Sequence, residues 1–133
     1  MYRHILLPTD GSERSERSIQ AGVDLAKALN AQVTGVFVGE QTYLPGSGET
    51  PTPTADSALA VVAEIAAAAG VVCQCISMLG DTPQDGIVQI ATEKKCDLIV
   101  MGTHGRSRVG KFFLGSTAAA VVADCQIPVL LHK

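Results

Sequence analysis

Residues 102–117 read GTHGRSRVGKFFLGST and separate two apolar runs, DLIVM at 97–101 and AAAVVA at 118–123. The first run predicts a buried strand and the second a helix, so a glycine-rich turn leads from a strand into a helix. Its glycines let backbone N–H groups approach a ligand, and the N–H groups of a first helical turn have no partners within the helix. The stretch holds no acid, and four of its side chains carry or can acquire positive charge: His104, Arg106, Arg108 and Lys111. We therefore predict a phosphate-binding turn; the alternative is a tight turn whose basic residues are only solvated.

A P-loop is one interpretation of this turn, because Gly105, Gly110 and Lys111 nearly spell the Walker A motif. That motif needs a Ser or Thr hydroxyl at the next position to bind Mg²⁺, and this chain has Phe112 there. A benzyl side chain cannot ligate a metal ion, so we reject the P-loop.

The spacing that fits is Gly102-x2-Gly105-x9-Gly115 followed by Ser116. Through this motif the chain resembles the ATP-binding branch of the universal stress protein family, and the likeness runs from ILLPTD at 5–10 to IPVLL at 127–131. The resemblance implies one domain over residues 1–133 with a Rossmann-like fold, similar to the adenine nucleotide alpha hydrolases. It also implies a five-stranded parallel sheet of strand order 3-2-1-4-5, with the ligand crevice between the first and fourth strands.

Strands and helices are predicted to alternate along the chain. Short apolar runs predict strands at residues 3–7, 32–38, 71–79, 97–101 and 127–132, with Pro8 ending the first. Apolar spacing and capping residues predict helices at about 13–30, 55–69, from Thr82 onward and at 116–124. Strands that are apolar on both faces are typical of an α/β fold, a parallel sheet with helices on both faces. Such sheets bind ligands at the carboxyl ends of their strands.

Residues 39–54 show no periodicity and contain three prolines and three glycines. They predict a long mobile loop, which acts either as a lid over a ligand or as a passive linker.

Composition limits the classes of partner. The chain has 133 residues, 47% of them hydrophobic and 17% charged, which indicates one globular domain. Its net charge of −3 argues against nucleic acid as a partner, because the basic residues are concentrated in one turn. No apolar run has the length of a signal peptide or membrane span, so we predict no membrane association.

The four cysteines lack the paired spacing of a metal site. Cys73 and Cys75 alternate on one face of a predicted strand, where cysteine usually serves as a small buried hydrophobe. We therefore predict structural thiols and a reducing, cytoplasmic location.

The resemblance assigns the binding of ATP, or of ADP or AMP, to two ends of the chain. Pro8, Thr9 and Asp10 match the loop that meets the ribose and base, and Val38 matches a backbone position beside the adenine. The remaining implied ligand-binding residues, from the strand end and the glycine-rich turn, are Met101, Gly102, His104, Gly105, Arg106, Gly115, Ser116 and Thr117. Mg²⁺ or Mn²⁺ is implied only through the phosphates. The alternatives are that Asp10 or Ser116 only caps a helix and that His104 is only solvated.

No catalytic or metal-ligating residue is predicted, because the strand at 97–101 ends in Val100 and Met101 rather than in an acid. We therefore predict an ATP-binding stress or signalling module. The alternatives are an interaction protein of the same fold that binds no nucleotide, and a slow ATP hydrolase. The resemblance also implies a homodimer formed through the apolar edge strand at 127–132.

Overall fold

The computed structural model describes residues 1–39, 55–79, 82–103 and 114–133. Five parallel strands form one sheet in the order β3-β2-β1-β4-β5, as predicted. The strands are β1 (His4–Thr9), β2 (Gln32–Gly39), β3 (Cys73–Leu79), β4 (Leu98–Gly102) and β5 (Val129–His132). Residues 40–54, the greater part of the predicted mobile loop, lie outside the described residues, so that prediction stays a prediction.

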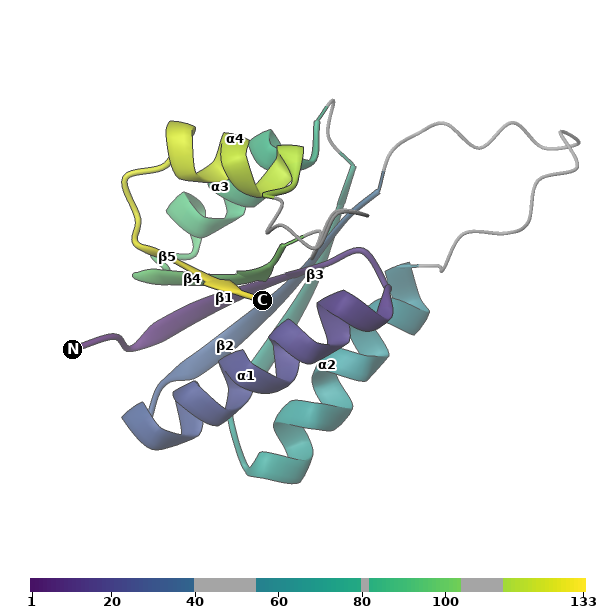
Figure 1. Cartoon of the computed structure of the whole chain (residues 1–133). Helices are drawn as coiled ribbons and strands as arrows, with labels where there is room; N and C mark the ends of the chain where they lie inside the picture. The colour runs from purple at the N-terminus through teal and green to yellow at the C-terminus, as the bar shows by residue number, and fades with distance from the viewer. Residues whose placement is uncertain (40–54, 80–81, 104–113) are drawn as a thin grey trace, which may run out of the picture.

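Helices cover both faces of the sheet (Figure 1). On one face lie α1 (Glu13–Leu29) and α2 (Ala55–Ala69), and on the other lie α3 (Pro83–Glu93) and α4 (Ser116–Asp124). The predicted helix positions are confirmed, apart from shifts of one residue at the ends. Among the helices of the described residues, none is both long and apolar enough to span a bilayer.

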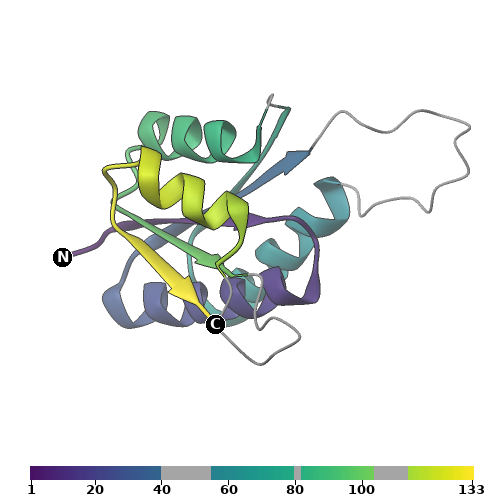
Figure 2. The same cartoon turned by 45° about the horizontal axis from the view of Figure 1, so that its top comes forward.

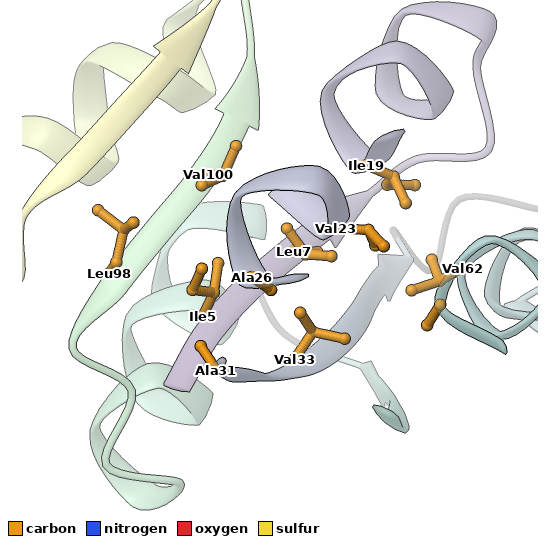
Figure 3. Close-up of a cluster of buried hydrophobic side chains, with 11 residues drawn as sticks. Ile5, Leu7, Ile19, Val23, Ala26, Ala31, Val33, Val62, Leu98 and Val100 are labelled. Atoms are coloured by element: carbon orange, nitrogen blue, oxygen red, sulfur yellow. The ribbon is translucent and has the colours of Figure 1, made fainter. Parts of the chain in front are cut away.

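Two hydrophobic clusters fill the two layers between sheet and helices. Ile5 and Leu7 of β1 belong to the cluster beneath α1 and α2 (Figure 3), whereas Leu6 belongs to the cluster beneath α3 and α4. All three side chains are fully buried. Consecutive residues of a strand point to opposite faces, so a strand buried on both faces is apolar at every position.

Local chemistry fixes where α1 and α3 begin. Ser12 is the N-cap of α1 and its side chain accepts a hydrogen bond from the Ser15 N–H. Thr82 caps α3 in the same way, and Pro83 takes the first helical turn, where its missing N–H is not needed. The predicted Thr82 cap is therefore confirmed.

The prediction that Pro8 ends the first strand is wrong, because β1 continues through Pro8 and Thr9 beside Val36 and Phe37 of β2. Successive residues of a parallel strand direct their polar groups alternately to the two neighbouring strands. The His4 carbonyl accepts from the Asp97 N–H on the β4 side, so Pro8, four residues later, also faces β4. The missing N–H therefore does not disturb the pairing with β2. On the other side, the β1–β4 register runs only through Ile5 and Leu6, and β4 continues beside β5.

The two outer strands are shorter than predicted. β3 begins at Cys73 rather than at residue 71, and β5 begins at Val129 rather than at residue 127. The predicted burial of the cysteine pair is also wrong, because Cys75 is exposed and Cys73 half-buried. β3 is an edge strand and has a neighbouring strand on one side only. Its side chains are therefore less covered than those of an inner strand.

Candidate functional site

The candidate site lies at the carboxyl ends of β1 and β4, which are neighbours in the sheet. From β1 the chain returns to β2 on one side, and from β4 it returns to β5 on the other. This reversal of strand order is the position where open parallel sheets bind ligands, because the loops after the two strands diverge. Topology therefore places the residues after Thr9 and the end of β4 at Gly102 at one edge of the sheet (Figure 2).

Hydrogen bonds hold the loop after β1 in one shape. The Thr9 hydroxyl accepts from the Gly11 N–H at 3.1 Å, and Gly11 has the positive φ of 82° that glycine adopts readily. Asp10 Oδ1 accepts from the Ser12 N–H at 2.9 Å and from the Ser15 hydroxyl at 2.7 Å. The interpretation of Asp10 as the helix cap is wrong, since Ser12 is the N-cap and Asp10 forms the turn before it.

Asp10 is a carboxylate at neutral pH. Partial burial acts to raise its pKa, but hydrogen bonds from Ser12 and Ser15 outweigh burial and hold the pKa below the usual value. The Asp10 side chain is exposed at the strand end. A carboxylate only accepts hydrogen bonds, so this group suits a hydroxyl or amino group and disfavours a phosphate.

The first turn of α4 offers the opposite electrostatic character. Gly115 is its N-cap, with extended φ and ψ of −64° and 156°, and the first turn contains no acidic residue. The interpretation of Ser116 as the cap is therefore wrong: Ser116 is the first helical residue, and its side chain is exposed. A glycine cap supplies no side-chain acceptor, so the cap itself leaves the first-turn N–H groups and the positive end of the helix dipole available to an anion.

The start of α4 lies close to the end of β4 (Figure 2). Leu114 packs against the buried cluster that contains Met101 and Ala118. A Cβ built on Gly102 would lie 3.5 Å from the Arg14 carbonyl oxygen, an ordinary contact distance. The end of β4 therefore meets the first turns of α1 on one side and the residue before the α4 cap on the other.

The other predicted site residues lie in different surroundings. Pro8 is buried in β1, and Met101 is 6% exposed, with its side chain in the cluster beneath α3 and α4. Val38 follows Phe37, the partner of Thr9 in β2, and therefore reaches the same sheet edge as Asp10. Thr117 is half-buried in the first turn of α4. His104, Gly105 and Arg106 lie outside the described residues.

Sequence reasoning missed Ser15, whose hydroxyl binds the Asp10 carboxylate. The spacing of Ser12 and Ser15 could have indicated this contact. The Ser15 N–H donates to the side chain of the cap Ser12, which brings both serines near the turn before the helix. It also missed Thr103, which is 7% exposed at the end of β4 and donates its N–H to the His132 carbonyl at 3.2 Å.

Two shallow grooves lie elsewhere, between the outer surfaces of α1 and α2. Gln20 and Ile65 line both grooves, and neither contains a predicted site residue. Both grooves are lined by residues of α1 and α2 and by none from the carboxyl end of a strand. Within the described ranges, no three His, Cys, Asp or Glu side chains gather so as to hold a metal ion.

Known proteins match the chain along its whole length. The sequence model of the Universal stress protein family matches residues 1–133. A universal stress protein of Thermus aquaticus is 38% identical over 137 residues, which cover 100% of both chains. A universal stress protein of Methanocaldococcus jannaschii is 34% identical over 142 residues, which cover 100% of this chain and 83% of the relative.

Solved structures give the same fold. A universal stress protein from Archaeoglobus fulgidus covers 100% of both chains with a TM-score of 0.77 and 28% identity. A universal stress protein in complex with cAMP has a TM-score of 0.76 and 28% identity, covering 99% of this chain and 97% of the other. The Archaeoglobus fulgidus protein in complex with dAMP has a TM-score of 0.70 and 26% identity, covering 99% and 98%. With a family match over every residue and relatives above 30% identity, this chain belongs to the universal stress protein family.

Proposed function

We propose that this universal stress protein binds an adenine nucleotide, ATP in particular, between the carboxyl ends of β1 and β4. One observation carries the proposal: a fixed carboxylate turn and a glycine-capped helix N-terminus follow these two neighbouring strands. The first group attracts hydrogen-bond donors and the second attracts anions. A nucleotide carries donors at its nucleoside end and negative charge at its phosphate end.

The two groups give the nucleotide a direction. Asp10 accepts from a ribose hydroxyl or from the adenine amino group, and the backbone of Val38 lies beside the base at the end of β2. The phosphates meet Gly102, Gly115, Ser116 and Thr117, together with His104, Gly105 and Arg106 of the turn. Backbone N–H groups bind the phosphate oxygens, and the Ser116 hydroxyl adds a donor.

The neighbours in complex with cAMP and dAMP support an adenine ligand, and both are monophosphates. We propose ATP because the basic turn carries more positive charge than one phosphate needs, with ADP and AMP as the alternatives. Mg²⁺ or Mn²⁺ accompanies ATP through the phosphates rather than through protein ligands.

In this proposal the chain is a stress or signalling module, and it changes its partners when ATP binds. The alternative from another class is an interaction protein that binds no nucleotide. A slow hydrolase is a further alternative, which predicts metal-dependent phosphate release that is lost in Asp10→Ala. We also propose a cytoplasmic location, supported by the four cysteines, none of which forms a disulfide.

A second copy of the chain is the proposed protein partner, paired through β5. This strand lies at the edge of the sheet, and Leu130 within it is 40% exposed. An apolar edge strand favours pairing with another chain.

The test is mass spectrometry of nucleotide released from freshly purified protein, beside the variants Gly115→Val and Ala123→Val. Valine at the buried cap position adds a branched Cβ where the phosphates approach, whereas valine at exposed Ala123 adds the same group away from the site. We expect ATP from wild type and Ala123→Val, and none from a folded Gly115→Val. Wild type without nucleotide, and without a thermal shift on added Mg-ATP, would favour the interaction protein.

A further inference from the structure

Cys73 and Cys75 form a pair of thiols on the edge strand β3, at the sheet edge remote from β5. Their Sγ atoms lie 3.9 Å apart, and neither takes part in a disulfide. Cys75 is exposed, and Cys73 is half-buried against the cluster beneath α1 and α2. The Cys75 Sγ contacts the Leu59 carbonyl of α2 at 3.6 Å. A reagent can therefore reach the pair from solvent.

A disulfide between these two cysteines does not suit the strand. Residues two apart on a strand have Cα atoms about 6.6 Å apart, and their Cβ atoms stay similarly distant because both point to one face. A disulfide requires Cβ atoms about 3.8 Å apart. Closing the bond would distort β3, whose Cys73 and Cys75 pair with Val33 and Gly35 of β2.

A thiophilic metal ion does suit this spacing. Two bonds of about 2.3 Å from tetrahedral Zn²⁺ to sulfur place the sulfur atoms about 3.8 Å apart. The observed 3.9 Å separation matches this distance without movement of the backbone.

We propose that Cys73 and Cys75 form a two-thiolate site for a divalent thiophilic cation of the Zn²⁺ and Cd²⁺ type. The cation replaces the two thiol protons, which leave to solvent, and no electron is transferred. Water or a small thiol fills the remaining positions on the exposed side of Cys75. Structural zinc sites use four protein ligands, so a site with two holds an exchangeable ion.

The first experiment titrates the full reduced chain with Cd²⁺ in competition with a chelator and follows thiolate-to-cadmium charge-transfer absorbance. We expect one ion per chain in wild type and in the control Cys96→Ser/Cys125→Ser, which keeps the pair. Cys73→Ser and Cys75→Ser should each bind at least about tenfold more weakly, since even residues that only orient ligands often contribute that much. Wild-type affinity in both single variants, or loss of binding in the control, would overturn the proposal.

A second measurement uses the wild-type chain and so does not depend on the folding of variants. Cd²⁺ should slow alkylation of exposed Cys75 and leave half-buried Cys125 unchanged, as read by mass spectrometry of peptides. Equal effects on both cysteines, or an effect on neither, would contradict a site at the pair. A Cys73–Cys75 disulfide formed on mild peroxide treatment of the native chain would also contradict it.

Discussion

Gly35 of β2 lies directly against Val62 of α2. A Cβ built on Gly35 would stand 2.8 Å from Val62 Cγ1 and 3.2 Å from Val62 Cβ, closer than carbon atoms normally approach. Val62 is fully buried, so its branched side chain cannot turn aside into solvent. The missing side chain of Gly35 therefore sets how closely α2 packs on the sheet.

Gly35→Ala should lower the free energy of unfolding by about 1–3 kcal/mol, the usual effect of overpacking a core. Chemical denaturation measures the change. Gly102→Ala is the matched control, because a Cβ there lies no closer than 3.5 Å to any atom of the described residues. Val62→Ala should restore part of the loss in a double variant, and equal effects of the two glycine variants would contradict the packing argument.

Asp97 should make the fold sensitive to acid. Its carboxylate accepts from the backbone N–H groups of Arg3 and His4 at 2.9 and 3.0 Å, which tie the start of β1 to the start of β4. Burial acts to raise its pKa, but these hydrogen bonds outweigh burial and lower the pKa below the model-peptide value of 3.8. Because the folded pKa is the lower one, the stabilisation is present above the unfolded value and is lost as pH falls through the folded value.

Asp97→Asn should therefore be less stable than wild type at neutral pH by about 0.5–1 kcal/mol, the low end for a hydrogen bond because solvent screens this carboxylate, with the difference shrinking below about pH 4. Thermal unfolding at pH 7 and pH 3 measures both values. Asp124→Asn, at an exposed position at the end of α4, should change little at either pH. A difference that persists unchanged at pH 3 would rule out the carboxylate as its source.

Variants of Asp10 and Ser15 distinguish direct contact with the ligand from support of the loop. Asp10→Ala should weaken Mg-ATP binding by roughly tenfold or more, the effect of losing a hydrogen bond to a charged group. Ser15→Ala removes one partner of Asp10 but leaves the Ser12 N–H in place, so its effect should be smaller. Isothermal titration calorimetry gives both affinities, and equal losses would mean that Asp10 acts only by shaping the turn.

Leu130 tests the proposed dimer. Leu130→Glu places a charge on the edge strand and should shift sedimentation from a dimer toward a monomer at micromolar concentration. Val72→Glu is the control, since Val72 is 68% exposed directly before β3, at the opposite edge of the sheet. A wild-type chain that sediments only as a monomer would refute the pairing.

The strand order, which followed from the family resemblance, and the helix positions, which followed from residue patterns, could be predicted. Alternation of apolar runs and caps such as Thr82 is local chemistry that the sequence carries directly. Burial at the sheet edge was less predictable: Cys75 looks like a core residue by pattern, yet β3 has a neighbouring strand on one side only. Residue type cannot reveal which strands lie at an edge without the topology.

The candidate site could likewise be predicted only in part from the sequence. The motif drew attention to the residues around Gly102 and Gly115, whose ligand contacts stay a prediction, and the two capping alternatives are wrong. Asp10 and Ser116 are both residue types that favour the N-cap position. The N-caps are Ser12 and Gly115 instead, because the cap is the residue directly before helical φ and ψ begin. Pro8 was likewise misread, since its effect depends on which neighbouring strand its missing N–H faces.

The orientation of Pro8 has a consequence for how the site tolerates substitution. A proline in the middle of a sheet is normally harmful, but here its defect falls on the side where β1 and β4 have already separated. The main-chain pairing thus sets the separation of those strand ends, and the separation does not depend on the side chains around it. Substitutions of the surrounding side chains therefore leave the separation of β1 and β4 in place.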